Sequence, residues 1–98
     1  MSYDYEFWQE FLDFFIIKNA IEFICEYNNL ETSGTKKDMI NRILDSISKD
    51  ITVEKVANLF PKKDLEVFSQ DKNGRVSGTR AEILQSVIKI FKERKGKT

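Results

Sequence analysis

Apolar residues recur at steps of three and four along most of this 98-residue chain, which is the spacing of one face of an α-helix. No glycine or proline interrupts this pattern between Asp4 and Asn28, so we expect a helix there, and a bend near residues 17–19 would fit its spacing. The next apolar stripe follows Thr35, with Asp38 three residues further on. This capping box predicts a helix that continues to about residue 48.

The second half of the chain predicts three more helices. Thr52 caps a short helix, and Pro61 both ends it and opens the next one. Thr79 begins a second capping box and the last helix, which we expect to fray into a basic tail at residues 92–97. The dipeptide Asn73-Gly74 leaves a β-hairpin open as an alternative, because it favours a type I′ turn.

The tripeptide Ser-Gly-Thr occurs twice, at residues 33–35 and 77–79, so the two copies are 44 residues apart. Shifting the chain by this offset pairs apolar residues with apolar residues and keeps the sign of charged ones. Lys36 falls on Arg80, for example, and Asp38 falls on Glu82. The chain therefore contains two copies of one unit, and this self-similarity decides the fold prediction.

The repeat predicts an all-α protein made of two tandem helix-extension-helix units. We expect an aromatic acidic helix over residues 1–17, unit 1 over residues 18–49, and unit 2 over residues 50–98, which includes a short connecting helix and the basic tail. A single unit of this length is near the size at which a hydrophobic core becomes marginal. The two units should therefore fold together as one domain.

Unit 1 resembles the SAP family of helix-extension-helix domains. The residues that match the family pattern are Ile21, Ile24, Leu30, Ser33, Gly34, Lys36, Met39, Ile40, Arg42 and Ile43. In unit 2 the matching residues are Ser77, Gly78, Arg80, Ile83, Leu84 and Val87. Gly74 stands where Leu30 stood and Ser86 where Arg42 stood, so the second copy is degenerate. We expect Val76 to fill the core in place of the missing leucine.

The resemblance implies a small DNA-binding module without enzymatic activity. The residues supply a physical reason as well, because a glycine before a helix lets a phosphate approach the unpaired N–H groups at the positive end of the helix dipole. Cations in the first turns add attraction. The expected nucleic-acid-binding residues are Ser33, Gly34, Thr35, Lys36, Lys37 and Arg42 in unit 1, and Ser77, Gly78, Thr79 and Arg80 in unit 2.

The expected binding is mainly to the backbone phosphates of double-stranded DNA, with modest and salt-sensitive affinity. Only Asn41 and Gln85 are candidates for reading bases. A purely structural interpretation stays open for the same residues. Ser-Gly-Thr is also an ordinary turn and helix cap, and Arg42 can pair with Asp38 one helical turn away.

The net charge of zero hides an asymmetry between the two ends of the chain. Residues 1–31 carry seven acids and one base, whereas residues 32–98 carry fifteen bases and nine acids. A basic segment of this kind points to an anionic partner, of which nucleic acid is the commonest large one. Without histidine, and with only Cys25, which we expect to be buried, the chain offers no zinc site or histidine-based catalysis. Residues 71–82 have Arg75 and Val76 at the fifth and sixth positions, where a calcium loop needs a ligand and a glycine. We therefore expect no catalytic residue, metal, cofactor or small-molecule substrate.

Nine of the twelve aromatic residues lie among the first 27. One interpretation is that they form a core shared by both units. The other is that Trp8, with Phe7 or Phe15, faces a protein partner or a second copy of the chain, which would make the protein an interaction adaptor with DNA binding lost. No membrane span or signal peptide is indicated, so a cytoplasmic location is expected.

Overall fold

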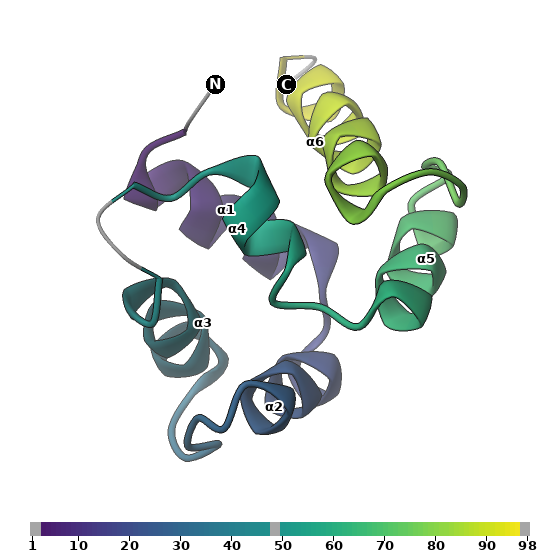
Figure 1. Ribbon diagram of the computed structural model, residues 1–98. Coiled ribbons are helices and arrows are strands. Elements are labelled where there is room, and N and C mark those ends of the chain that lie inside the picture. The colour runs from purple at the N-terminus through teal and green to yellow at the C-terminus, as the bar shows by residue number, and fades with distance from the viewer. Residues whose placement is uncertain (1–2, 48–49, 97–98) are drawn as a thin grey trace.

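The computed structural model describes residues 3–47 and 50–96, and these form six α-helices around one core (Figure 1). The helices are α1 (Tyr5–Phe15), α2 (Lys18–Tyr27), α3 (Lys36–Asp45), α4 (Val53–Ala57), α5 (Lys62–Asp71) and α6 (Arg80–Gly96). The predicted all-α fold class is confirmed. None of the described helices is long and apolar enough to cross a membrane.

The helix predicted between Asp4 and Asn28 is not continuous: the chain breaks between α1 and α2, close to the bend expected near residues 17–19 and directly before the expected start of unit 1 at residue 18. Ile16 and Ile17 both have extended backbones, with ψ angles of 138° and 164°. Ile16 turns into the core and is 2% exposed, whereas Ile17 is 71% exposed. The break changes the direction of the chain, so that α1 and α2 each pack against α3. No glycine or proline marks this position, and tertiary packing determines it.

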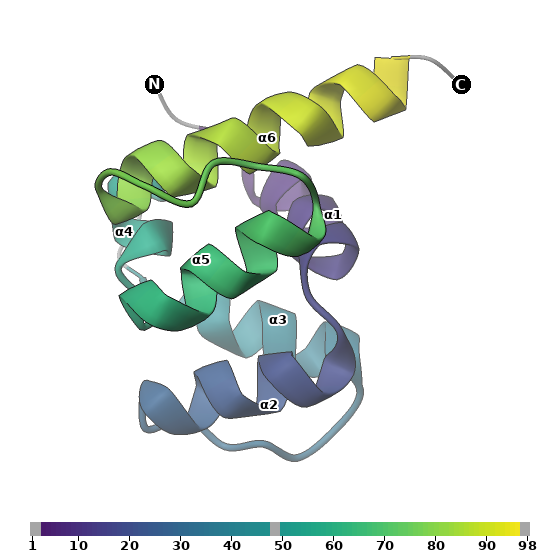
Figure 2. The same ribbon diagram turned by 90° about the vertical axis from the view of Figure 1, so that its right-hand side faces the viewer.

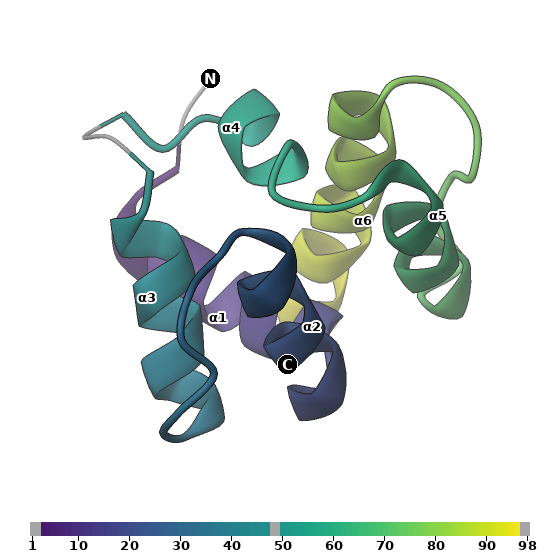
Figure 3. The ribbon, with the colours of Figure 1, turned by 60° about the horizontal axis from the view of Figure 1, so that its bottom comes forward.

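The two helices of each unit run in the same direction and are joined by an extended loop that returns along them (Figure 2). In unit 1 the loop joins α2 to α3, and in unit 2 it joins α5 to α6. Consequently the N-termini of the two helices lie at the same end of each unit. Figure 3 shows α2 between α3 on one side and α5 on the other.

The backbone of the two loops is nearly identical at equivalent positions. Gly34 and Gly78 have φ angles of 98° and 102°, in the left-handed region that favours glycine. Asn29 and Asn73 also have positive φ, of 59° and 63°, and each ends the preceding helix with the paired backbone hydrogen bonds of a Schellman motif. Asn73 therefore terminates α5, and the alternative of a β-hairpin at this position is wrong.

The aromatic residues of α1 form the centre of a core shared by both units. Trp8 and Phe11 are 0% exposed, and α1 packs against both α3 and α6. Phe15 lies edge-on to Phe60 and Phe68, with ring centroids 6.0 Å and 5.9 Å away. The shared-core interpretation is confirmed, and the expectation that Trp8 faces a partner is wrong, because the indole is fully covered.

The last helix extends further than its sequence indicated. Residues 92–96 are helical, so the predicted fraying over this part is wrong, while Lys97 lies outside the described residues. Lys95 forms an ion pair with Glu10 of α1, and the Lys92 ammonium donates a hydrogen bond to the Tyr3 hydroxyl at 3.0 Å. These contacts with α1 and with the residue Tyr3 before it stabilise the final turns of α6.

Candidate nucleic-acid interface

The N-terminus of α3 holds a carboxylate of the chain itself. The Asp38 side chain accepts a hydrogen bond from the Thr35 backbone N–H at 3.0 Å, and the Asp38 N–H donates to the Thr35 hydroxyl at 3.1 Å. Hydrogen bonding of the carboxylate, first to the Thr35 backbone N–H and then to the Thr35 side chain, lowers the pKa of Asp38. A Cβ placed on Gly34 would lie 2.7 Å from an Asp38 carboxylate oxygen. The space that the sequence suggested for a phosphate is therefore close to a fixed negative charge.

Lys36 faces α1 and holds two helices together. Its ammonium lies 3.3 Å from the Asp13 carboxylate and donates to the Asp13 backbone carbonyl at 2.8 Å. This carbonyl belongs to the last turn of α1, where carbonyls have no partner within the helix. Lys37 is exposed, but it lines an open groove of about 360 Å³ whose charged residues include Glu6 and Glu10. Lys36 and Lys37 thus both lie among acids.

Arg42 stabilises the loop of unit 1 by hydrogen bonds to its backbone. Its guanidinium donates to the backbone carbonyls of Glu31 and Ser33, at 2.7 Å and 2.9 Å. It forms no ion pair with Asp38 in the described part of the chain. The Ser33 hydroxyl donates to the Glu31 carboxylate at 3.4 Å. The side chain most expected to meet a phosphate is therefore used to fix the path of the loop.

The first turn of α6 is capped in the same way as that of α3. Its cation, Arg80, contacts the residues before α5, whereas Lys36 contacts α1. Glu82 accepts from the Thr79 N–H at 2.8 Å, and its pKa is lowered by that backbone bond and by the Thr79 hydroxyl. Arg80 donates to the Phe60 carbonyl at 2.8 Å. Because Phe60 directly precedes the start of α5, this bond holds the N-termini of α5 and α6 side by side.

The start of α5 carries two exposed lysines, Lys62 and Lys63. Its N-cap is Pro61, which supplies no side-chain hydrogen bond to the first turn. Neither lysine forms an ion pair among residues 3–47 and 50–96. This N-terminus therefore combines unpaired backbone N–H groups with two free cations, which is the combination that attracts phosphate.

The loop of unit 2 is supported by hydroxyl groups. The buried Ser69 hydroxyl donates to the Arg75 carbonyl at 2.6 Å, and the Arg75 N–H donates to the Ser86 hydroxyl at 2.9 Å. The Arg75 side chain donates to the Ser77 carbonyl at 2.7 Å, the position equivalent to Ser33. Val76 is 49% exposed, so the expectation that it fills the core in place of Leu30 is wrong.

The two candidate base readers lie in different settings. The Asn41 side-chain oxygen accepts a hydrogen bond from the Gln9 side chain of α1. The Asn41 backbone carbonyl accepts one from the Tyr5 hydroxyl at 3.3 Å. That hydroxyl also donates to Asp45 at 2.9 Å, and burial together with this bond raises the pKa of Tyr5 to about 12. Asn41 therefore serves the contact between α1 and α3, whereas Gln85 is exposed on α6.

The sequence expectation omitted Lys62, Lys63 and Arg75. The first two had a visible signal, because two lysines directly follow a proline at a predicted helix start. Arg75 had none, since its role depends on the conformation of the loop. Cys25 is buried, as expected, and within the described residues no group of three or more His, Cys, Asp or Glu side chains could hold a metal ion.

Comparisons with known proteins identify no relative of this chain. No family model matches its sequence, and no curated protein or solved structure matches it either. The geometry of the two units is therefore the basis for a functional assignment.

Proposed function

We propose that the protein is a non-enzymatic nucleic-acid-binding module that holds double-stranded DNA through its backbone phosphates, mainly at unit 2. The observation that carries this proposal is the pair of helix N-termini that Arg80 holds together through the Phe60 carbonyl. Beside them lie the exposed Lys62 and Lys63. The resemblance of the chain to SAP domains supports the same class of function.

The electrostatics of this end of unit 2 suit an anion. The first N–H groups of α5 lack an intrahelical acceptor, and the dipole of this ten-residue helix places partial positive charge there. A lysine ammonium adds a charge-assisted hydrogen bond to a phosphate oxygen. Asp64 and Glu82, in the first turns of α5 and α6, reduce the local charge without cancelling that of Lys62, Lys63 and Arg80 together. This arrangement supports modest-affinity binding of about two phosphates.

Unit 1 is the weaker of the two candidate surfaces. Its cations Lys36 and Arg42 are engaged with Asp13 and with loop carbonyls, and Lys37 lies in a groove with acids. Each nearby carboxylate repels a phosphate at short range. The sequence put unit 1 first, whereas these contacts favour unit 2.

The alternative function, an adaptor that binds a protein through the aromatic face of the N-terminal helix, loses its principal residue. Trp8 is fully buried, and its neighbours Phe11 and Phe15 are buried with it. A partner could reach these rings only if α1 left the core. The aromatic residues of α1 therefore favour no second function.

Fluorescence anisotropy of a labelled duplex of about 20 base pairs tests the proposal. With two phosphate contacts, affinity should fall about tenfold between ~50 and ~200 mM salt. Lys62→Glu/Lys63→Glu should abolish binding. Lys18→Glu/Lys37→Glu is the matched control, because it makes the same charge change at exposed cations near the helix starts of unit 1, and it should weaken binding much less. Equal loss in both variants, or no binding at low salt, would contradict the proposal.

A further inference from the structure

Two aromatic side chains of α2 lie outside the core. Phe23 is 46% exposed and Tyr27 is 48% exposed, and their spacing of four residues places them side by side on one face of the helix. The core contribution of α2 is made by Ile21, Ile24 and Cys25, each 0% exposed. The two aromatic rings are therefore not required to complete the core, and together they form an apolar patch on the surface.

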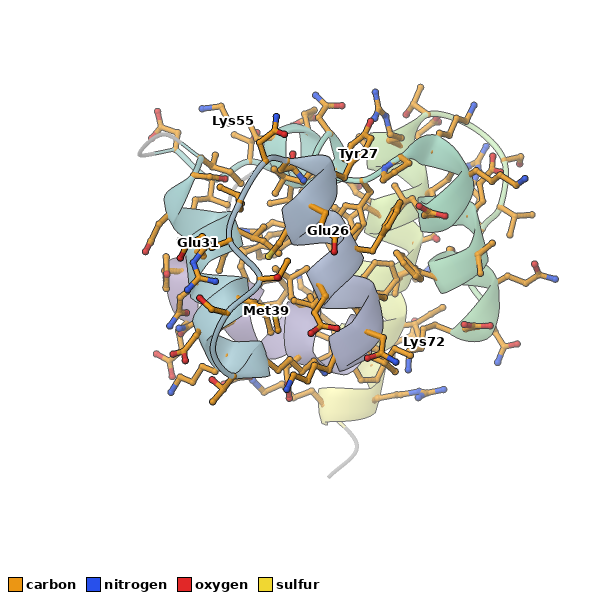
Figure 4. The ribbon with its side chains drawn as sticks, turned by 90° about the horizontal axis from the view of Figure 1, so that it is seen from below. Glu26, Tyr27, Glu31, Met39, Lys55 and Lys72 are labelled. Atoms are coloured by element: carbon orange, nitrogen blue, oxygen red, sulfur yellow. The ribbon has the colours of Figure 1, made fainter. Side chains whose placement is uncertain are left out.

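Acidic residues border this patch. Glu22 and Glu26 are also four residues apart on α2, and Glu31 follows in the loop. Figure 4, which looks onto α2, shows Glu26, Tyr27 and Glu31 on the side toward the viewer. Within the described residues neither Glu22 nor Glu26 has an ion-pair partner. We call the surface formed by Glu22, Phe23, Glu26 and Tyr27 the α2 face.

The charges of the α2 face do not stabilise the helix that carries them. Like charges four residues apart destabilise a helix by a few tenths of a kcal/mol, and an acid in the last turn opposes the helix dipole. The last turn of α2 contains Glu26 and no basic residue. Fold stability therefore explains neither the exposed rings nor the acids beside them.

The backbone structure that the two units share does not require these residues either. At the equivalent positions of α5 the chain has Glu66, Val67, Gln70 and Asp71. At these four positions unit 2 thus has two acids, as unit 1 does, but no aromatic residue. The α2 face is a property of unit 1 alone.

We propose that the α2 face docks a cationic amphipathic segment of another protein. Its apolar side chains would cover Phe23 and Tyr27, because aromatic residues contribute strongly at the centres of protein interfaces. Its lysines or arginines would meet Glu22 and Glu26, and complementary charge speeds and orients such an encounter. The same carboxylates repel phosphate, so this surface does not suit nucleic acid. The proposal does not depend on DNA binding by unit 2.

An NMR titration of the isotope-labelled full chain tests this. The probe is a synthetic amphipathic helix of leucine and lysine, and its matched control has glutamate in place of lysine. The lysine peptide should shift the amides of residues 22–27, whereas the glutamate peptide should not. Phe23→Ser/Tyr27→Ser should weaken binding by about tenfold or more, and Glu22→Gln/Glu26→Gln should weaken it and reduce its salt dependence.

Val67→Ser/Val76→Ser is the matched control variant, because it removes two other half-exposed apolar side chains and should leave binding unchanged. Three results would overturn the proposal. The lysine peptide could shift residues of the groove between α1 and α3 instead, or the glutamate peptide could bind equally well. Sedimentation could also show a dimer that Phe23→Ser dissociates, in which case a second copy of the chain covers this face.

Discussion

Unit 1 and unit 2 hold their loops in the same path by different chemistry. In unit 1 the loop is held by Leu30, which packs against the core, and by the two hydrogen bonds of Arg42. In unit 2 the hydroxyls of Ser69 and Ser86 hold the loop backbone, and Gly74 occupies the place of the leucine. The comparison shows that the same loop conformation can be stabilised either by an apolar side chain in the core or by hydrogen bonds from hydroxyl groups.

The two supports exclude each other. A Cβ on Gly74 would lie 2.4 Å from the Ser69 hydroxyl oxygen and 2.9 Å from a Val87 methyl group. A side chain at position 74 is therefore incompatible with a serine at position 69 in this place. The second copy differs from the first at three loop-supporting positions, where Cys25, Leu30 and Arg42 are replaced by Ser69, Gly74 and Ser86, and we expect these three differences to be coupled.

The largest expected effect comes from removing the core that the two units share. Trp8→Ala should destabilise the protein by about 4 kcal/mol, because it empties a fully buried site. Trp8→Phe is the control and should cost far less, since among the described residues the indole N–H has no hydrogen-bond partner to lose. Chemical denaturation monitored by circular dichroism measures both. Separate unfolding of the two units in the alanine variant would contradict a shared core.

The next effect separates the two loops. Gly74→Ala should destabilise unit 2 by about 2–3 kcal/mol, because the added methyl group collides with Ser69 and overpacks a dense site. Gly96→Ala has no atom within 4 Å of the new methyl group and serves as the control in the same denaturation experiment.

A triple substitution tests whether the three loop-supporting positions act together. Ser69→Cys/Gly74→Leu/Ser86→Arg gives unit 2 the support of unit 1, and it should be more stable than Gly74→Leu alone. A triple variant no more stable than the single one would show that the three positions are not coupled.

A smaller and equal effect is expected at the two loop glycines. Gly34→Ala and Gly78→Ala each force an L-residue into a left-handed conformation, which costs about 1–2 kcal/mol. Thermal unfolding of the two variants should therefore give similar decreases in Tm. A large decrease for one glycine only would indicate that the frames of the two units differ in solution.

The smallest effect concerns pH. Asp38 and Glu82 have pKa values below their ordinary values of 3.8 and 4.5, because each accepts hydrogen bonds from its capping threonine. Their contribution to stability is complete above those ordinary values and is lost as pH falls through the lower folded values. Carbon-detected NMR titration should show both shifts. Thr35→Val and Thr79→Val should each return the nearby pKa toward its ordinary value.

The sequence predicted the elements that depend on local signals. The capping boxes at Thr35 and Thr79 and the proline at position 61 gave the starts of α3, α6 and α5 correctly. The 44-residue offset also relates the starts and ends of α2 and α5 without error. These elements are predicted correctly because the residues that determine them lie within a few positions in the sequence.

The rest depends on partners that are distant in sequence. Lys36 meets Asp13, 23 residues away, and Arg80 meets Phe60, 20 residues away. Helical periodicity cannot distinguish a cation that faces solvent from one that clamps a backbone carbonyl. The sequence indicated only a bend near residues 17–19 where the chain breaks, and it missed the length of the last helix, because both features are fixed by contacts between helices.

The most direct test of the central claim is an NMR titration of the labelled protein with a short DNA duplex, comparing the equivalent amides of the two units. We expect shifts at Lys62, Lys63 and residues 78–80, and much smaller shifts at residues 34–37. Binding that moves the amides of residues 34–37 most, or that moves neither set, would contradict the assignment of phosphate binding to unit 2.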